Sequence, residues 1–271
     1  MKHRRPTVAD LLSMKGKRQL IMLRVVTLEE AEAAEKAGID LVSVPPALLG
    51  SEFREAAPTV FAFPGLDDFV TAEDYLRAAF QAMRAGGDAV YCAAGLSTVR
   101  RLREEGIPVC GHVGLIPSKA TWTGGFRAVG KTAESALEIW RQVKALEEAG
   151  AFAAEIEVVP GEVAAAISQR TSLLMLSMGA GTGCDAQYLF AEDVLGQNRG
   201  HYPRHAKVYR NFTSELDRLQ QERISAFREY AEDVRSGAYP GKAHLVGIAP
   251  EELDSFLSWI EPQEQADFRA R

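Results

Sequence analysis

A junction that recurs along the chain constrains its fold more than any other feature: a helical stretch ends in glycine, and an apolar strand follows at once. It occurs in "EKAGIDLVSV", "MRAGGDAVYC", "REEGIPVCGHV" and "LEEAGAFAAEIEVV". A glycine after a helix supplies a left-handed cap. A strand that is apolar at nearly every position is typical of a parallel sheet covered on both faces. The junction therefore indicates a repeated strand–helix unit.

Eight strands of this kind can be placed along the chain. They are expected at 19–25, 40–44, 59–63, 88–93, 108–113, 152–159, 172–179 and 187–195. Helix start signals lie between them, since Thr27 with Glu30 and Thr71 with Asp74 have capping-box spacing, and Thr132 also precedes a helix. Eight parallel strands that alternate with helices in 271 residues predict an α/β fold, the (β/α)8 TIM barrel. A doubly wound open sheet is the competing architecture, but no GxGxxG follows the first strand.

The chain continues past the last expected strand as helices. An amphipathic helix is expected over 213–236 and a shorter one over 250–260. We therefore expect a single barrel domain over 1–271 with extra C-terminal helices.

Composition and charge restrict the function classes. The net charge is -6, and Lys and Arg are scattered among acidic residues apart from the opening "KHRRP", which argues against a nucleic-acid surface. No apolar run approaches the roughly 20 residues that cross a bilayer, and the N-terminus lacks an apolar signal core. We expect a cytoplasmic protein with no membrane partner. The three cysteines lack metal-type spacing and are expected to be buried free thiols.

His112 ends the expected strand 108–113, in "PVCGHVGLIP". In a barrel of this type, active groups gather at the C-terminal ends of the strands. The following segment, 114–131, is longer than most connections and contains "TWTGGFRAVGK", which is typical of a lid or a binding loop. The alternative is a hydrogen-bonded structural histidine beside an ordinary surface loop.

Several stretches of the chain are similar to the ketopantoate hydroxymethyltransferase family. They are "TVADLLSMKGKRQLIML", "MRAGGDAV", "IPVCGHVGLIP", "GGFRAVGK", "ALEEAGA", "EIEVVPGEVA", "MGAGTGCDAQ" and "SGAYPGKAH", and they keep the family's order over 7–244. The segment 245–271 falls outside the resemblance and is expected to be a C-terminal extension.

The resemblance implies a barrel of the phosphoenolpyruvate/pyruvate type that assembles into a homo-oligomer. It also implies a reaction in which a base removes the proton beside a 2-oxo acid's carbonyl, and the enolate adds to a one-carbon unit from methylenetetrahydrofolate. Such chemistry needs a placed base and positive charge at the carbonyl oxygen. Family members supply that charge with magnesium on two aspartates at the ends of strands two and three, helped by a lysine on strand four and a histidine on strand five. The base is a glutamate on strand six.

Two of these groups carry over by resemblance: His112 stands at the histidine position and Glu157 at the base. Glu155 shares a strand face with Glu157, because side chains alternate along a strand, so either carboxylate could point inward. The alternative for these carboxylates is solvation beyond the barrel.

The magnesium aspartates do not carry over. Where the family has the first aspartate and its neighbouring serine, this chain has Pro45, Pro46 and Ala47, and Phe63 stands near the position of the second. These side chains offer no hard oxygen ligands, so we expect no metal at these strand ends. Asp67 and Asp68 come several residues later and are candidates for displaced ligands.

Two further positions differ from the family and are candidate substrate-binding residues. Tyr91 replaces the lysine of strand four, and Arg24 stands at the end of the first strand. A guanidinium binds a carboxylate in a bidentate fork, so Arg24 could hold a small-molecule carboxylate without a metal. The alternative is a salt bridge at the barrel rim, for which Glu192 and Asp193 are candidate partners.

Three functions remain open. The chain could be a genuine 3-methyl-2-oxobutanoate hydroxymethyltransferase with displaced metal ligands, which would use methylenetetrahydrofolate. It could be a diverged enzyme that acts on a small 2-oxo acid or related carbonyl compound without magnesium, and the residue chemistry favours this reading. It could also be a catalytically silent barrel that binds a metabolite or regulates a partner.

Overall fold

The computed structural model describes residues 4–66 and 68–268, so Asp67 lies outside the described residues. The chain divides into two compact units, the first ending at Thr213 and the second beginning at Ser214. The first unit contains every strand, and the second consists of helices and connections. That the whole chain is one domain stays a prediction.

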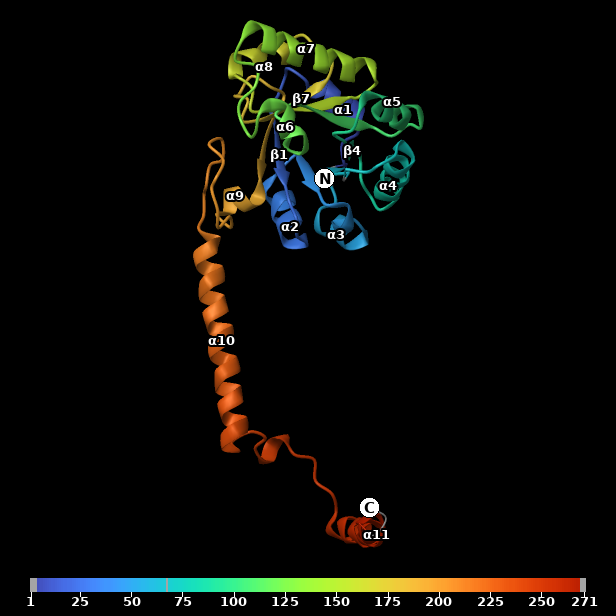
Figure 1. The fold of residues 1–271 in the computed structure, drawn as a ribbon, viewed down its shortest axis with the longest axis vertical. Coiled ribbons are helices and arrows are strands. Elements are labelled where there is room, and N and C mark those ends of the chain that lie inside the picture. The colour runs from blue at the N-terminus through green and yellow to red at the C-terminus, as the bar shows by residue number, and fades with distance from the viewer. Residues whose placement is uncertain (1–3, 67, 269–271) are drawn as a thin grey trace. The chain divides into compact units, whose positions relative to one another are not determined.

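Parallel strands form the wall of the first unit (Figure 1). They are β1 (Leu20–Arg24), β2 (Leu41–Val44), β3 (Phe61–Pro64), β4 (Val90–Tyr91), β5 (Val109–Gly114), β6 (Ala153–Glu157), β7 (Leu174–Met178) and β8 (Ala186–Phe190). Their hydrogen-bonded order is β3-β2-β1-β8-β7-β6-β5-β4. A parallel bridge between Gly65 and Tyr91 joins the two end strands of this order. The predicted (β/α)8 barrel is therefore confirmed.

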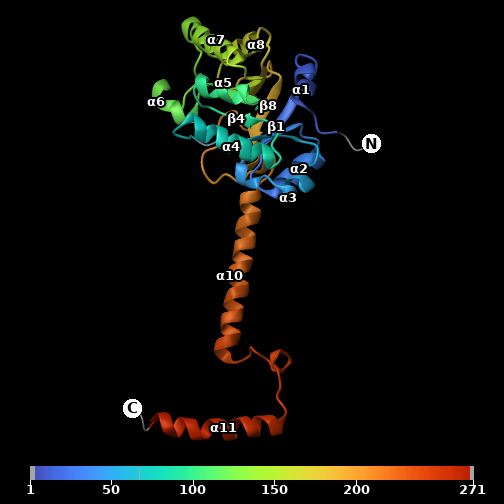
Figure 2. The same ribbon diagram turned by 90° about the vertical axis from the view of Figure 1, so that its right-hand side faces the viewer.

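Helices lie around the outside of this wall (Figures 1 and 2). They are α2 (Leu28–Ala37), α3 (Ser51–Ala56), α4 (Ala72–Arg84), α5 (Leu96–Glu104), α7 (Ala133–Glu148) and α8 (Gly161–Ser168). The short α1 (Val8–Met14) precedes the first strand. Each of the long helices presents small or branched apolar side chains to the outer face of the barrel, so the strands are buried on both faces.

The helix caps largely follow the sequence pattern. Capping boxes form at Thr71 and Thr132, as the spacing predicts for Thr71. Thr27 accepts a hydrogen bond from the Glu30 N–H, but the Glu30 carboxylate accepts from the N–H of Val26 rather than that of Thr27. The capping box predicted at Thr27 is thus half formed, because the Glu30 carboxylate bonds to Val26, the residue before the N-cap.

Apolar side chains fill the N-terminal half of the barrel interior. Phe63 stacks on Phe152 with ring centroids 6.0 Å apart, and Phe61 lies 5.0 Å from Phe63. Leu11 of α1 packs into the same cluster from below and is 1% exposed. The interior is therefore closed at this end and can hold a ligand at the C-terminal end of the strands.

The end of the eighth strand differs from the prediction. β8 stops at Phe190, and the chain continues as the helix α9 (Ala191–Leu195), which ends on Gly196 at φ 70°. The predicted strand 187–195 is therefore wrong over its second half, because an apolar run with a glycine after it suits a short helix as well as a strand. Glu192 and Asp193 lie on this helix rather than at the strand end.

The second unit begins within the long helix α10 (Phe212–Ser236), which matches the predicted helix 213–236. It ends with α11 (Pro250–Phe268), which is longer than the predicted 250–260. The segment 114–131 of the first unit is not wholly irregular, since it contains a short 3-10 turn and α6 (Ala120–Thr123). Among the described residues, no helix combines the length and the apolar character that a membrane crossing requires.

Candidate active site

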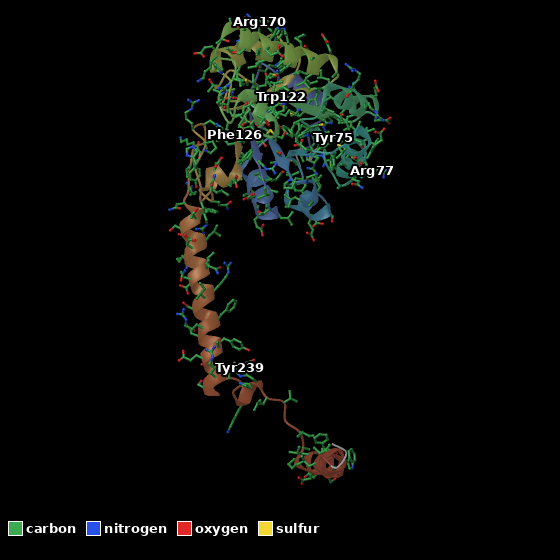
Figure 3. All side chains as sticks on the ribbon, in the orientation of Figure 1. Tyr75, Arg77, Trp122, Phe126, Arg170 and Tyr239 are labelled. Carbon is green, nitrogen blue, oxygen red and sulfur yellow. The ribbon has the colours of Figure 1, made fainter. Side chains whose placement is uncertain are left out.

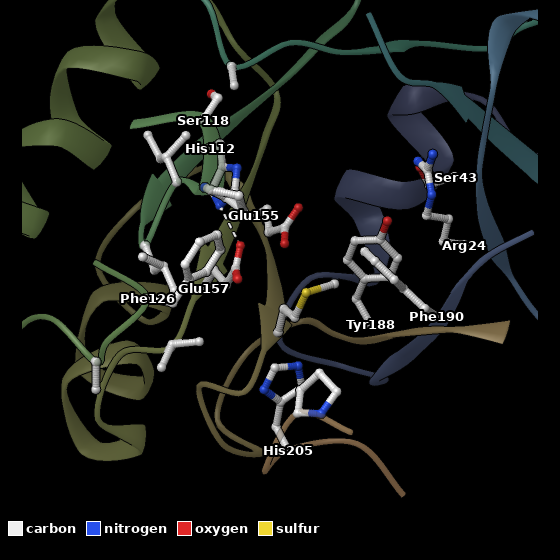
Figure 4. Close-up of a pocket in the computed structure, with 18 of the residues that line it drawn as sticks. Arg24, Ser43, His112, Ser118, Phe126, Glu155, Glu157, Tyr188, Phe190 and His205 are labelled. Carbon is white, nitrogen blue, oxygen red and sulfur yellow. Dashed lines mark ion pairs between the residues drawn. The ribbon is translucent and has the colours of Figure 1, made fainter. Parts of the chain in front are cut away.

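A cavity of about 880 Å³ opens at the C-terminal ends of the strands (Figure 4). The residues that line it from the strands are Arg24, Ser43, Tyr91, His112, Glu155, Glu157, Met178, Tyr188 and Phe190. The loops add Asp68, Phe126, Arg127, Lys131, Asp193, Arg204 and His205, among others. Trp122 and Phe126 on the loop after β5 are 92% and 77% exposed (Figure 3). The four predicted site residues, Glu157, His112, Arg24 and Tyr91, thus lie in one cavity.

His112 projects from β5, and each of its two ring nitrogens lies next to a polar side chain. Nδ1 is hydrogen-bonded to the hydroxyl of Tyr91, on the neighbouring strand β4. Nε2 lies 3.1 Å from Oε2 of Glu157, on the other neighbour β6. The two atoms are close enough for an ion pair, but their directions do not satisfy a hydrogen bond, and Nε2 has no hydrogen-bond partner within the described part of the chain.

The charge state of His112 follows from its surroundings. Burial lowers the pKa of the imidazole, but the carboxylates of Glu155 and Glu157 outweigh it, and the net effect is a raised pKa. Tyr91 has a pKa well above its usual value, because it is buried and faces Glu155. The pair at this wall is therefore an imidazole that favours its charged form and a phenol that stays neutral.

Glu155 lies inside the barrel with Glu157. The two residues alternate with Ala154 and Ile156, which pack outward against the helices, so both carboxylates face the cavity. Glu155 is 3% exposed, and burial raises the pKa of its carboxyl, helped by the nearby Glu157 and opposed by His112. Donor atoms of His112, Glu155 and Glu157 lie within 4.8 Å of one another, so these three side chains could hold a metal ion.

Arg24 lies across the cavity from this cluster, next to Tyr188 and Phe190 (Figure 4). Its guanidinium carbon lies 5.8 Å from the centroid of the Phe190 ring. No ion pair joins Arg24 to Glu192 or Asp193 within the described residues, and Arg24 lines the cavity. Asp193 instead accepts a hydrogen bond from the Asn198 amide at 3.4 Å.

Apolar side chains stand at the ends of β2 and β3, where the resemblance implies a magnesium site. β2 ends at Val44 and is followed by Pro45, and β3 ends at Pro64 after the fully buried Phe63. Magnesium requires hard oxygen ligands in an octahedral arrangement. The residues present at these two ends therefore do not fit a magnesium ion.

Some cavity residues were not foreseen from the sequence. Tyr188 and Ser43 could have been found from strand alternation, because Tyr188 faces the interior of the barrel like the other members of the inner cluster. His205 lies on the loop after α9, and no pattern in that loop marks it. Asp68 does line the cavity, from the segment after β3.

A (β/α)8 wall with a cavity at its C-terminal mouth is a barrel of the kind that enzymes use for chemistry on small molecules. The sequence model of the family described as ketopantoate hydroxymethyltransferase matches residues 53–242. The 3-methyl-2-oxobutanoate hydroxymethyltransferase of Kosmotoga olearia is 33% identical over 88% of this chain and 96% of its own length. That of Thermus thermophilus is 35% identical over 89% and 99%. The chain belongs to the ketopantoate hydroxymethyltransferase family.

Solved structures with a similar fold are more distant. The carboxyl transferase domain of Rhizobium etli pyruvate carboxylase has a TM-score of 0.50 and 13% identity, over 69% of this chain and 42% of that one. A 2,3-dimethylmalate lyase has a TM-score of 0.49 and 15% identity over 98% and 99%. At 13% identity, the similarity to the carboxyl transferase domain supports the barrel fold alone.

Proposed function

We propose that the chain is a diverged member of its family. In this proposal it removes a proton from a small 2-oxo acid or related carbonyl compound and makes or breaks a carbon–carbon bond beside the carbonyl, without magnesium. The observation that carries the proposal is the His112–Glu157 pair, 3.1 Å apart, in a cavity that Arg24 also lines.

Each group has a role that its chemistry suits. Glu157 is the base that takes the proton, and it is held at the rim where the barrel opens. Arg24 binds the carboxylate of the substrate through its guanidinium. His112, whose raised pKa favours the imidazolium, offers positive charge to the enolate oxygen. Tyr91 orients that imidazole through Nδ1 and contacts the substrate from β4.

Exchange of substrate protons for solvent deuterium tests this proposal directly. A panel of 2-oxo acids in deuterated buffer is followed by proton NMR with the wild-type chain and with Glu157→Gln. We expect exchange with at least one acid, and a loss of about 10²- to 10⁴-fold in the variant, which is what a placed base contributes. Glu162→Gln, on α8 and outside the cavity lining, is the matched control. No exchange by the wild-type chain with any acid would favour the catalytically silent, metabolite-binding barrel.

A second candidate is a genuine 3-methyl-2-oxobutanoate hydroxymethyltransferase. It is favoured by the names of the relatives and by Asp68, which lines the cavity and could act as a displaced metal ligand. This candidate requires magnesium binding and product formation from 3-methyl-2-oxobutanoate with methylenetetrahydrofolate. Calorimetry with magnesium, repeated with Asp68→Asn, separates it from the magnesium-free proposal.

A further inference from the structure

We propose that His112, Glu155 and Glu157 form a site for a borderline divalent transition ion such as Zn²⁺, and that occupancy of this site switches the enzyme off. The binding site stands on the geometry alone, whereas its inhibitory effect rests on the proposed function of Glu157. The site lies on β5 and β6, not at the ends of β2 and β3.

Strand register brings the three ligands together. His112 pairs with Glu155 across the β5–β6 ladder, and Glu157 follows two residues later on the same face. Their donor atoms lie within 4.8 Å of one another, and Nε2 of His112 is 3.1 Å from Oε2 of Glu157. Zinc bonds of about 2.0 to 2.2 Å place tetrahedral ligands about 3.3 to 3.6 Å apart, so small side-chain rotations complete the site. Figure 4 shows the three side chains on one wall of the cavity.

A second observation points to a ligand at the same place. The side chain of His112 is 4% exposed, and its Nε2 has no hydrogen-bond partner among the described residues. A buried polar atom without a partner is rare in folded proteins and calls for an occupant. Nδ1 is hydrogen-bonded to the Tyr91 hydroxyl, so in the neutral ring that carries its proton on Nδ1 the lone pair of Nε2 is available to an ion, which then replaces the second proton of the imidazolium. Metal-binding histidines are oriented by a partner on the other nitrogen in the same way.

The ligand set selects the class of ion. One imidazole nitrogen and two carboxylates suit zinc and its neighbours, whereas magnesium prefers oxygen ligands and retains its waters. Three protein ligands leave a fourth position open toward the cavity. A dication there also offsets the negative charge of the two carboxylates, which share this wall with the imidazole of His112.

The consequence for activity follows from the shared residue. A carboxylate bound to a dication is a much weaker base, so it is a poor acceptor for the proton of a carbon acid. Zinc therefore competes with the proton for Glu157, and the ion-free chain is the active form.

Calorimetry with zinc chloride tests the site, with the full chain first stripped by a chelator and then dialysed. We expect one zinc ion per chain for the wild type. Glu155→Gln, which removes a ligand other than the proposed base Glu157, should weaken zinc binding at least tenfold. Asp68→Asn, a cavity carboxylate outside the cluster, is the matched control and should bind as the wild type does. Magnesium at a hundredfold excess should not displace the ion.

Equal zinc affinity in the wild type and Glu155→Gln, or no binding by either, would overturn the site. Deuterium exchange gives the second readout: one equivalent of zinc should abolish exchange by the wild type, a chelator should restore it, and the exchange that Glu155→Gln retains should resist zinc. Acceleration by zinc would overturn the inhibitory role. A chain that binds zinc at this cluster but exchanges no substrate proton would instead count against the proposed function and leave the site standing.

Discussion

Gly114 shows how closely the backbone packs around the candidate base. It lies at the end of β5 with φ +87°, and a Cβ at this position would overlap the carbonyl oxygen of Glu157. Only glycine combines this conformation with this approach at no steric cost. The turn that follows His112 is therefore tied to the position of the base on the next strand.

Gly114→Ala should lower the free energy of unfolding by more than about 1 kcal/mol, because both the backbone angle and the contact oppose a side chain. Urea denaturation measures this change. Gly95→Ala is the matched control, since Gly95 has φ -66° and nothing within 4 Å of an added Cβ. Equal stability of the two variants would contradict the steric argument.

Glu147 supplies a pH-dependent contribution to stability at the outer layer. Burial alone would raise the pKa of this carboxyl, but the Lys144 ammonium and the Ser172 hydroxyl and N–H lower it to about 2. The charged form is thus favoured in the folded state. Its contribution is present above the unfolded pKa of about 4.3 and is lost as the pH falls toward the folded pKa.

Glu147→Gln should therefore cost about 2 kcal/mol at pH 7, which is typical of hydrogen bonds to a charged group. The difference from the wild type should shrink as the pH falls from about 4.5 to about 2. Thermal unfolding across this range measures it, with the exposed neighbour Glu148→Gln as control. A difference that stays constant with pH would show that the carboxylate charge is not the cause.

The sequence could predict part of the candidate site because some of its residues depend only on local pattern. His112 and Glu157 stand at strand ends within stretches similar to a known family, and alternation placed Glu155 on the face of Glu157. The bond between Tyr91 and His112 depends on the β4–β5 register, which no local pattern specifies. His205 reaches the cavity through a loop, where neither spacing nor alternation gives a direction.

At the scale of elements, α7 begins with a complete capping box. The Thr132 hydroxyl accepts from the Ser135 N–H, and the Ser135 hydroxyl oxygen accepts from the Thr132 N–H. Thr132→Ala should lower the free energy of unfolding by about 1 kcal/mol. Thr121→Ala, at an exposed threonine of the short helix α6, is the control for denaturant unfolding, and a cost as large as that of Thr132→Ala would contradict the capping role.

Strands were easier to predict than their ends. The helix–glycine–strand junctions mark where a strand begins. The observed strands start one or two residues after the predicted positions, except β8, which starts one residue earlier. No comparable signal marks where a strand stops, so the apolar pattern extends the predicted eighth strand over α9, and β4 is shorter than the predicted 88–93. The end of a strand depends on which backbone groups of the neighbouring strand are available for hydrogen bonds. This is a property of the tertiary structure and not of the local sequence.

At the scale of the whole molecule, every residue that lines the large cavity belongs to the first unit, between Arg24 and His205. A chain shortened to residues 1–244 should therefore exchange substrate protons at the wild-type rate in the NMR assay. A large loss of exchange, with the circular dichroism of the barrel unchanged, would show that the tail takes part in the site. Light scattering of both chains would test the homo-oligomer that we expect from the family, and any role of 245–271 in it.

The plug of Phe61, Phe63, Phe152 and Leu11 below the cavity has a kinetic consequence. The apolar cluster closes the base of the barrel, so compounds enter and leave the cavity through its C-terminal mouth. If two substrates meet here, the one that lies deeper has to bind first, and its product has to depart last. Steady-state inhibition patterns should then be those of a compulsory order, imposed by the route rather than by affinity.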